Sequence, residues 1–487
     1  MRKAKIVCTI GPASETPAVL DRLIESGMDA ARLNFSHGSH ESHGRAIKAI
    51  REAAGRRRAA VAIIQDLQGP RIRVGTLPDS GLEVVSEQRV RLVTVRYRSG
   101  AQIGVQSLAQ SDLPAIPVTY PHLVQDVRPG ARILIDDGNI ELVANRVSGG
   151  ELQCTVIGGG RILSHKGINL PGTQVSTPTI TDKDREDLRF GVAQGVDYLA
   201  LSFVRGPEDV REVKKLIAEC GGDLPVIAKI ERGEAIESLE AILDQADGVM
   251  IARGDLGVEL GPEAVPVLQK RIIAQANRRR RLVITATQML ESMTQRARPT
   301  RAEASDVANA VFDGTDAVML SAETAVGRYP VEAVGVMDRI VRAAEEEVER
   351  NSEAQRGRRA EATTCRISFP EAICEAASAA AAVTKASAIV AFSEGGPTAL
   401  LMSKQRPTAP ILALTPFEPI RRRIALYWGA IPHTVPQIDA TDERVREAER
   451  RLKQEGLVIT GQRIVILSGT VVGQPGGTNF LKLHEVE

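Results

Sequence analysis

The sequence predicts an α/β protein whose largest part is a (β/α)8 barrel. Eight short apolar runs recur along the first two thirds of the chain, and most of the segments between them have the length and the 3.6-residue periodicity of helices. Buried parallel strands are continuous apolar runs of this kind, and eight strand-helix units are the number that closes such a barrel. The eight predicted strands are residues 5–10, 28–34, 61–66, 196–202, 226–231, 248–252, 282–287 and 316–321.

The spacing of these runs is interrupted once, between the third and fourth predicted strands. Residues 70–172 lack helical periodicity and are rich in Val, Gly and Pro. Residues 132–142 have the pattern of a hairpin in which Asp137 and Gly138 supply the turn. We therefore predict an inserted all-β domain. An insertion at the carboxyl end of a barrel strand overhangs the active-site face and can act as a lid.

Beyond about residue 345 the composition changes again. A charged segment leads to an alanine-rich helix near 371–386, and short apolar runs then alternate with a helix around 418–428. This alternation predicts a smaller α/β domain with a parallel sheet. The expected organisation is a first barrel part at 1–69, the β domain at 70–172, a second barrel part at 173–345, and a C-terminal domain for regulation or assembly at 346–487.

The charge balance argues against partners that a basic field would attract. The 487 residues include 62 Lys and Arg against 61 Asp and Glu, so neither nucleic acid nor an anionic membrane is an expected partner. The N-terminal apolar run is too short for a signal peptide, and no stretch approaches the roughly 18 apolar residues of a membrane span. Five scattered cysteines without a C-x-x-C pair argue against disulfides or zinc and are typical of a reducing cytoplasm.

Polar side chains occur where the predicted strands end, and barrel enzymes carry their chemistry at the carboxyl ends of the strands. Lys229 and Glu231 are two residues apart, so they share one face at the end of the fifth strand. An isolated pair of this kind is more often a structural ion pair than a site. Further polar residues are expected on the same rim, however: Arg32, Asn34, Asp66, Ser202, Asp255 and Thr287.

These rim residues include two carboxylates suited to a metal. Glu231 and Asp255 come from adjacent strand ends and can jointly hold one Mg²⁺, which commonly takes one or two carboxylates. Asp255 lies between Gly254 and Gly257, which allow tight turns whose N–H groups can bind a carboxylate or a phosphate.

Lys229 has two possible roles beside such a metal. It can form a Schiff base, or it can act as a point charge that stabilises a developing oxyanion or a transferring phosphoryl group. The metal favours the second role, because Schiff-base lysines are usually kept nearly neutral. Arg32 and Arg73 add donors suited to phosphate, so we expect a rim that handles anions. No Walker A and no G-x-G-x-x-G motif is present, so a nucleotide would have to bind without those loops.

Seven blocks of the sequence are specific enough to indicate a family. They are RLNFSHG (32–38), DLQGPRIR (66–73), KGINLPG (166–172), IAKIER (227–232), ARGDLGVE (252–259), ITATQMLESM (284–293) and RPTRAEASDVANAVFDGTDAVMLSAET (298–324). In this order they resemble pyruvate kinase over nearly the whole barrel, while the C-terminal third resembles the family more loosely. The resemblance implies phosphoryl transfer from phosphoenolpyruvate to ADP, which gives pyruvate and ATP in the last step of glycolysis.

The resemblance also implies roles for single residues. Glu231 and Asp255 match the ligands of Mg²⁺, which Mn²⁺ can replace. Lys229 matches the lysine beside the transferring phosphoryl group and the enolate oxygen. Arg32 and Arg73 match arginines on the phosphate and nucleotide side.

Two further sites follow from the same resemblance. The backbone of Gly254 and Asp255, together with Thr287, matches the pocket for the substrate carboxylate, and Thr287 is a candidate for the proton path to the enolate carbon. A monovalent-cation site is matched by four residues, namely Asn34, Ser36, Asp66 and the carbonyl of Leu67.

One block departs from the family pattern. Many members that require K⁺ have DTKGPEIR where this chain has DLQGPRIR, so Gln68 replaces a lysine and Arg71 replaces a glutamate. Members with a basic residue at the second of these positions tend not to need K⁺. We therefore expect K⁺ to be dispensable, although the residues of its site are present.

The C-terminal part is expected to carry an effector site. The segment SEGGPTA (393–399) opens a predicted helix, whose N–H groups, with the hydroxyls of Ser393 and Thr398, can hold a phosphate. The family's sugar-phosphate site lies in the corresponding loop. Members that respond to fructose 1,6-bisphosphate often have a basic residue where Glu394 and Pro397 stand here, so we expect a monophosphate effector or none. The resemblance further implies allosteric control and a homotetramer.

The sequence leaves two other functions open. A Mg²⁺-dependent aldolase or lyase on a similar barrel would act on a pyruvate enolate without a nucleotide, but the β insertion and the block at 298–324 disfavour it. A scaffold or nucleic-acid binder would use the arginine runs 278–281 and 421–423. The first of these runs precedes the seventh strand, at the face opposite the chemistry, which favours a structural role.

Four more residues lie in or near the matched blocks. His37 is interpreted as a hydrogen-bonding support rather than as the catalytic base. Asp136 and Asp137 are either lid groups or turn residues. Lys166 lies where the insertion rejoins the barrel, and the sequence leaves its role open.

Overall fold

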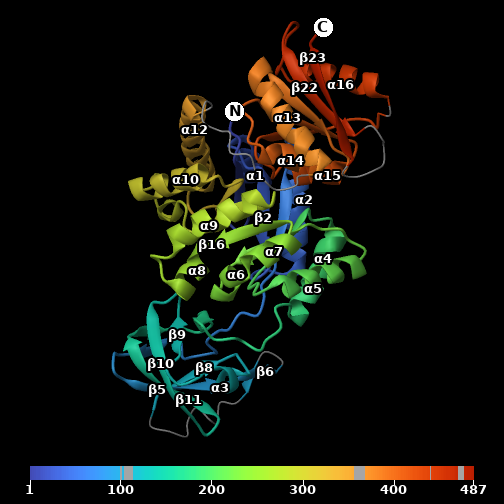
Figure 1. Ribbon diagram of the computed structural model, residues 1–487. Coiled ribbons are helices and arrows are strands. Elements are labelled where there is room, and N and C mark those ends of the chain that lie inside the picture. The colour runs from blue at the N-terminus through green and yellow to red at the C-terminus, as the bar shows by residue number, and fades with distance from the viewer. Residues whose placement is uncertain (99–100, 104–112, 356–367, 439, 470–476) are drawn as a thin grey trace.

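The computed structural model describes residues 1–98, 101–103, 113–355, 368–438, 440–469 and 477–487. Its centre is a closed barrel of eight parallel strands, as predicted (Figure 1). The strands pair in chain order around the barrel, and the last closes against the first. They are β1 (Lys5–Thr9), β2 (Ala30–Asn34), β3 (Ala62–Asp66), β14 (Tyr198–Leu201), β15 (Val226–Ile230), β16 (Gly248–Ala252), β17 (Leu282–Ala286) and β18 (Ala317–Leu320).

Helices cover the outside of the barrel and form one large hydrophobic core with the strands. Several begin at caps that the sequence supplies, since Ser39, Thr181 and Thr300 each accept the N–H of the third following residue. The helices are α1 (Pro17–Glu25), α2 (His40–Arg57), α4 (Asp182–Gln194), α5 (Pro207–Glu219), α6 (Gly233–Glu237), α7 (Leu239–Gln245), α8 (Arg253–Leu260), α9 (Val265–Arg278), α10 (Arg301–Asp313), α11 (Ala322–Ala325) and α12 (Pro330–Gln355), with a 3₁₀ turn at Glu291–Thr294.

Within the described residues, the insertion at 70–172 contains strands and one short helix, α3, and it has a hydrophobic core of its own. Its main sheet has the order β13-β9-β10-β11-β5-β8. The predicted hairpin is β9–β10, where Asp136 and Asp137 take the left-handed conformation of the turn. The elements are β4 (Leu82–Val84), β5 (Arg89–Thr94), β6 (Arg96–Arg98), β7 (Ala101–Ile103), β8 (Ala115–Val118), α3 (Leu123–Asp126), β9 (Arg132–Ile135), β10 (Ile140–Ser148), β11 (Glu151–Gly158), β12 (Gly160–Ile162) and β13 (Ile168–Asn169).

The C-terminal part is an α/β unit at the end of the barrel opposite the insertion (Figure 1). Its sheet has the order β21-β20-β19-β22-β23, and β23 runs antiparallel to β22. The strands from β19 to β22 form the predicted parallel sheet. β23 adds an antiparallel edge strand for which no prediction was made, and the chain between β22 and β23 is too short for a helical crossover. The elements are α13 (Phe369–Thr384), β19 (Ala388–Phe392), α14 (Pro397–Lys404), β20 (Ile411–Thr415), α15 (Glu418–Ile424), β21 (Ala430–Thr434), α16 (Thr441–Gln454), β22 (Arg463–Gly469) and β23 (Thr478–Glu485).

Four aspartates form a repeated arrangement at the amino ends of the barrel strands. They directly precede the second, fourth, sixth and eighth barrel strands, and each carboxylate accepts a backbone N–H of the preceding strand at 2.8 Å. Each also pairs with a Lys or Arg side chain. The pairs of aspartate and N–H donor are Asp29 with Ile6, Asp197 with Ile63, Asp247 with Val226, and Asp316 with Val283. These carboxylates link neighbouring strands two by two.

Two of these aspartates also bind the C-terminal part to the barrel. Arg422 Nε lies 2.9 Å from Asp197 Oδ1. Lys404 Nζ and Arg406 Nη2 lie 2.5 Å and 2.7 Å from the two carboxylate oxygens of Asp316. Lys404 and Asp316 are both buried, so this contact is an internal charge cluster rather than a surface ion pair.

A loop of the C-terminal part enters the bottom of the barrel. Leu426 is fully buried among the side chains of the barrel interior, and Tyr198 Oη donates to the Arg423 carbonyl at 2.8 Å. Since Leu426 has to leave its helix to reach this position, α15 ends at Ile424 rather than near residue 428, as had been predicted.

The arginine runs form ion pairs and hydrogen bonds within the protein. Arg279 and Arg281 follow the last residue of α9, and Arg422 and Arg423 lie on α15 against the barrel. Their partners are Glu240 and Asp244 for Arg279, the carbonyls of Leu243 and Asp244 for Arg281, Asp197 for Arg422 and Asp223 for Arg423. These contacts support the structural interpretation of the first run and assign structural contacts to the second run as well.

The buried charge cluster at Asp316 leads to a prediction about pH. Burial lowers the pKa of Lys404 to about 8 from an ordinary value of 10.5, an effect that Asp316 only partly offsets. Between these pH values the unfolded chain binds more protons at Lys404 than the folded chain does, so this residue's contribution to the free energy of unfolding rises with pH. We expect the native protein to gain stability relative to Lys404→Met as the pH increases from 8 to 10.

Urea unfolding of both proteins at matched pH values measures this difference. Lys48→Met, which removes an exposed lysine of α2, is the control and is expected to differ from the native protein by a constant amount. A difference between native protein and Lys404→Met that stays constant over the same pH range contradicts the prediction.

Among the described residues, no helix is long and apolar enough to cross a membrane.

Candidate active site

Lys229 is the centre of a buried charge network at the carboxyl ends of β14 and β15. Its Nζ lies 2.8 Å from Glu231 Oε1 and 3.2 Å from Asp66 Oδ1. It also donates to Ser202 Oγ at 2.8 Å, and Ser202 Oγ in turn donates to the Leu67 carbonyl at 2.7 Å. The predicted pairing of Lys229 with Glu231 is therefore present, together with a second carboxylate and a hydroxyl that hold the ammonium in place.

The pKa shifts of this network show which groups carry charge. Burial lowers the pKa of Lys229, but the carboxylates of Asp66 and Glu231 outweigh burial and raise it above its ordinary value. A lysine with a raised pKa stays protonated, so it is unsuited to Schiff-base formation and suited to the point-charge role.

The pKa of the Glu231 carboxyl is also raised, which for a carboxyl favours the neutral form. Burial raises its pKa, Lys229 opposes this, and the negative charge of Asp255 raises the pKa further. The Phe203 N–H donates to Glu231 Oε2 at 2.8 Å. Since Glu231 and Asp255 repel each other within a buried site, a cation between them would lower the energy of both.

Arg32 belongs to the same charge network through its ion pair with Asp66. Its Nε lies 2.6 Å from Asp66 Oδ2, and its Nη1 donates to Thr9 Oγ1 at 3.1 Å. Burial raises the pKa of Asp66, but Lys229 and Arg32 outweigh burial and lower it, so this carboxylate is ionised between two cations. The guanidinium of Arg32 is thereby held at the end of β2.

The four residues predicted for a monovalent cation lie at the ends of β2 and β3. Asn34 pairs with Asp66 in the register of the two strands, and Asn34 Oδ1 accepts the Ser36 N–H at 3.1 Å. The Leu67 carbonyl accepts the hydroxyl of Ser202. Arg71 follows on the exposed chain that leads into the insertion.

Thr287 and the start of α8 lie together at the ends of β16 and β17. The Gly254 N–H donates to Thr287 Oγ1 at 2.8 Å. The tight turns predicted at Gly254 and Gly257 are absent, because both residues belong to α8, which begins at Arg253. The N–H groups that face the site are therefore those of a helix N-terminus, which also favours anions.

Backbone strain is concentrated on the same rim. Phe203, Thr287 and Gln288 have φ values of 56°, 69° and 53°, and each follows closely after a barrel strand. Such left-handed backbone costs on the order of 1–3 kcal/mol per non-glycine residue and is found mostly where function requires it.

Arg73 lies in the insertion, within its predicted bounds of 70–172, and forms a bridge with Gly167. Burial lowers the pKa of His37, and the positive charges of Arg73, Arg71 and Arg32 lower it further. The three arginines are therefore close enough to His37 to act on it, and His37 is neutral, as suits a hydrogen-bonding support.

Barrel and insertion line one open cleft. Its walls come from the rim and from the chain segments that enter and leave the insertion. They include Phe203, Arg205, Glu231, Arg232, Asp255 and Glu259 from the barrel, and Arg71, Asp137, Gly167 and Asn169 from the other side. Lys166 Nζ lies 2.8 Å from Asp136 Oδ1 beside this cleft.

Sequence profiles agree with this geometry. The profile of the pyruvate kinase barrel domain matches residues 1–334, and the profile of the pyruvate kinase alpha/beta domain matches residues 371–484. The chain belongs to the pyruvate kinase family. It is therefore a phosphotransferase of glycolysis that forms pyruvate and ATP from phosphoenolpyruvate and ADP, which excludes the aldolase and scaffold alternatives.

Individual pyruvate kinases are similar over the whole chain. Pyruvate kinase 2 of Synechocystis sp. and pyruvate kinase of Geobacillus stearothermophilus are each 45% identical over 490 residues, covering 100% of this chain and 80% of each relative. Pyruvate kinase of Clostridium perfringens is 41% identical, with 100% of both chains covered. The crystal structure of a pyruvate kinase from Cryptosporidium parvum superposes with a TM-score of 0.89 at 35% identity, over 100% of this chain and 96% of that one.

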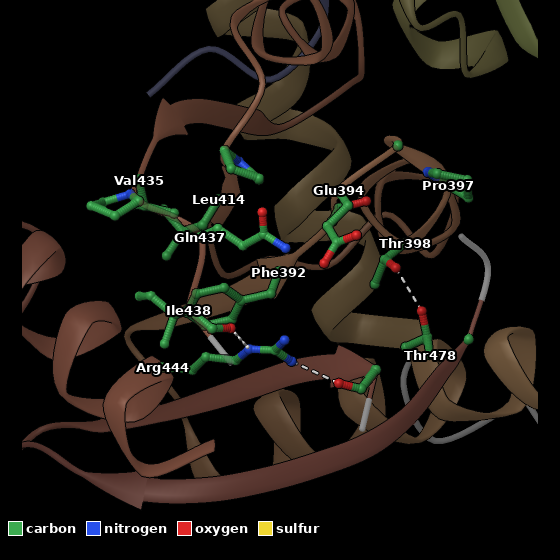
Figure 2. A pocket seen from close by; sticks show the side chains of 16 residues that line it. Phe392, Glu394, Pro397, Thr398, Leu414, Val435, Gln437, Ile438, Arg444 and Thr478 are labelled. Carbon is green, nitrogen blue, oxygen red and sulfur yellow. Dashed lines mark hydrogen bonds between the residues drawn. The ribbon is translucent and has the colours of Figure 1, made fainter. Parts of the chain in front are cut away.

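The predicted effector residues of this pyruvate kinase line a separate pocket in the C-terminal part (Figure 2). Ser393 Oγ accepts the Ala399 N–H at 3.4 Å, and the hydroxyls of Thr398 and Thr478 lie 2.6 Å apart. Arg444 reaches the pocket from α16, but its Nε and Nη1 donate to the carbonyls of Ile438 and Gly469, as Figure 2 shows.

Three residues of the pyruvate kinase cleft were not predicted as site residues. Arg205, Arg232 and Glu259 contact the chain segment that leaves the insertion. Arg232 adjoins Glu231 and Glu259 lies four residues after Asp255, so their positions beside predicted ligands were a usable signal. Their contacts could not be inferred, since the partners belong to the irregular segment around residue 173.

Proposed function

We propose that this pyruvate kinase transfers the phosphoryl group with Lys229 as the charge-stabilising residue and with Glu231 and Asp255 as ligands of a divalent ion. The observation that carries the proposal is the buried Lys229, which is kept protonated by Asp66 and Glu231. Phosphoryl transfer requires little covalent chemistry from the protein, so fixed charge and positioning dominate.

The donor set at Glu231 and Asp255 fits Mg²⁺ or Mn²⁺. Both are hard cations that prefer carboxylate oxygens, and Mg²⁺ usually keeps water and substrate oxygens in its remaining positions. Within the described residues, no group of three or more His, Cys, Asp or Glu side chains could hold a metal alone. A divalent ion here would thus depend on substrate oxygens, and when bound it would neutralise charge on the transferring phosphoryl group.

The other groups have roles in binding and orientation. Lys229 meets the negative charge that develops on the phosphoryl and enolate oxygens, and Arg32 donates to the phosphate from the opposite side. The first turn of α8, at Gly254 and Asp255, together with Thr287, receives the substrate carboxylate. Thr287 Oγ also belongs to the proton path toward the enolate carbon.

We propose that Arg73 binds the nucleotide from the insertion and that the insertion acts as a lid. Support comes from the shared cleft and from the Asp136–Lys166 pair at its edge. We propose domain boundaries at 1–69 and 173–345 for the barrel, at 70–172 for this lid and at 346–487 for the C-terminal domain.

A metal-binding measurement tests the ligand assignment. Glu231→Gln removes one of the two proposed carboxylate ligands and is expected to weaken Mn²⁺ binding by at least about tenfold, since even outer-shell changes at metal sites cost 10- to 100-fold. Electron paramagnetic resonance of free Mn²⁺ gives the affinity without any turnover. Glu237→Gln, at an exposed position of α6, is the control. Unchanged Mn²⁺ affinity in Glu231→Gln contradicts the assignment.

The pocket at Ser393 and Thr398 is proposed to hold a monophosphate effector or none. Among the described residues that line it, Arg444 is the only Lys or Arg, and two of its nitrogen atoms are already bonded to carbonyls. Glu394 adds a carboxylate to the same lining. A single cationic group of this kind suits one phosphate better than two.

Effector titration at subsaturating phosphoenolpyruvate tests this proposal. We expect a sugar monophosphate or a nucleoside monophosphate to activate at lower concentration than fructose 1,6-bisphosphate, or none of them to activate. Thr398→Val, which removes a hydroxyl of the pocket, should abolish any activation without changing the rate at saturating substrate. Strong activation by the bisphosphate alone would overturn the proposal.

Three further properties are proposed on the family resemblance. The enzyme assembles as a homotetramer through the C-terminal domains and barrel faces, it is regulated through the C-terminal domain, and it works in the cytoplasm. Light scattering of the purified chain decides the first of these, since a monomer would contradict it. We propose that the enzyme is active without K⁺ bound at Asn34, Ser36, Asp66 and Leu67, because of the positive charge of Arg71.

A further inference from the structure

The segment that leads from the insertion back to the barrel is held from both sides. Residues 171–179, here called the return segment, lie between β13 and α4 without regular structure. On the insertion side, the Ser176 N–H donates to Asp126 Oδ2 at 2.8 Å. On the barrel side, Arg205 Nη1 donates to the Val175 carbonyl at 2.8 Å. These contacts therefore connect the return segment to the insertion on one side and to the barrel on the other.

Arg232 and Glu259 hold the beginning of the return segment. Arg232 Nη2 donates to the Thr173 carbonyl at 3.0 Å and lies 3.6 Å from Glu259 Oε1. Burial raises the pKa of the Glu259 carboxyl, which the Arg232 charge and a hydrogen bond from the Gly172 N–H partly offset. The two side chains are only 11% and 4% exposed, so they are buried contacts rather than solvated surface charges.

Both anchors share a short rigid segment with a proposed metal ligand. Arg232 directly follows Glu231 at the end of β15. Glu259 stands four residues after Asp255 in α8, so the two side chains lie on the same face of that helix. Each proposed ligand is thus separated by one helical turn or less from a residue that contacts the return segment. A displacement of either ligand toward a bound ion would therefore also move that residue.

A third anchor connects to the same carboxylate from another strand. The Phe203 N–H donates to Glu231 Oε2 at 2.8 Å, and Arg205 stands two residues further along the chain. Besides the Val175 carbonyl, Arg205 binds Thr179 Oγ1 at 2.8 Å. The loop that follows β14 therefore contacts both Glu231, through Phe203, and the return segment, through Arg205.

We propose that Arg232 and Glu259 are positioning residues that couple the divalent-ion site to the position of the insertion. This inference rests on the proposed function, because it takes Glu231 and Asp255 as metal ligands. A bound ion holds both carboxylates in place and thereby orders the return segment. By linkage, an ordered return segment favours ion binding by the same factor.

Hydrogen exchange of the full-length enzyme, read by mass spectrometry with and without Mn²⁺, tests the coupling. In the native enzyme we expect Mn²⁺ to slow exchange in residues 172–179 by at least about fivefold, the low end of usual coupling factors. Arg232→Met should lose this protection, and its Mn²⁺ affinity should fall by the same factor. Arg232→Lys, which keeps the charge, should restore part of both effects.

Arg185→Met is the matched control, because Arg185 pairs with Glu212 on the outer helices and should leave both readouts unchanged. Equal Mn²⁺ protection of residues 172–179 in the native enzyme and in Arg232→Met, while Glu231→Gln weakens Mn²⁺ binding, overturns the coupling alone. Unchanged Mn²⁺ affinity in Glu231→Gln overturns the metal-ligand assignment, and the coupling with it. Thermal unfolding of Arg232→Met and Arg232→Lys confirms that both variants are folded before either result is interpreted.

Discussion

Replacing Lys229 by Met is expected to lower kcat by at least about a thousandfold, while Mn²⁺ and phosphoenolpyruvate still bind. Removal of one preorganised donor to a developing oxyanion costs roughly 10²- to 10³-fold, and a full buried charge stabilises more than a neutral donor. The charge of Lys229 is needed chiefly in the transition state, so the loss should fall on kcat rather than on substrate affinity.

The loss in Lys229→Met is measured by a coupled assay for ATP formation, with Mn²⁺ binding followed separately. Lys214→Met is the matched control, because Lys214 pairs with Asp247 at the opposite end of the barrel. Lys229→Met leaves the buried Glu231 and Asp66 without their lysine partner, so the thermal unfolding of this variant has to be compared with that of the native enzyme. Near-normal turnover in a folded Lys229→Met enzyme would contradict the assignment of Lys229 as the charge-stabilising residue.

The enzyme is expected to keep nearly full activity with Mg²⁺ in a buffer free of K⁺ and NH₄⁺, whereas Arg71→Glu should depend on K⁺. The substitution changes the local charge by two units, and each unit at about 6 Å and an effective dielectric near 20 amounts to roughly 3 kcal/mol toward a monovalent cation. Arg71 is exposed, so screening by water reduces this value. We expect K⁺ affinity to rise by about tenfold to a hundredfold in the variant.

Rates with and without K⁺ for native enzyme, Arg71→Gln and Arg71→Glu test the charge argument. Arg71→Gln removes the positive charge without adding a negative one, so its K⁺ dependence should be intermediate. The ligands Asn34, Ser36 and Asp66 remain unchanged in all three proteins. If the native enzyme loses most of its rate without K⁺, Arg71 does not replace the cation and the site is used after all.

The barrel could be predicted because its signals are local. Each strand is a short apolar run with both faces buried, and each run is visible without knowledge of its neighbours. The same holds for Lys229 and Glu231, whose spacing of two residues places them on one face at the end of a strand. Their 2.8 Å contact is the direct consequence of that spacing.

Features that depend on distant segments were predicted less well. The antiparallel edge strand β23 was not predicted, because strand orientation depends on the connection that precedes it. The end of α15 was placed too late because the burial of Leu426 inside the barrel overrides the local preference for helix.

A repeated signal at the amino ends of the strands went unused. An aspartate stands directly before four of the barrel strands, at 29, 197, 247 and 316. A charged residue beside a buried strand is unfavourable unless it is paired, so this pattern indicates four structural carboxylates. The residues that pair with them, such as Lys404 and Arg422, could not be identified in this way because they belong to the C-terminal part.

The sequence by itself determined the barrel, the family and the chemical types of the active-site residues, because these depend on short-range periodicity and on contiguous motifs. Only the tertiary structure decided which charges face one another. Asp66 lies between Lys229 and Arg32, and Arg232 reaches the carbonyl of Thr173, through contacts between residues 34 to 163 positions apart. Electrostatic energy depends on distance in space rather than along the chain, so the ionisation of Lys229 and the coupling of the metal site to the insertion follow from the fold alone.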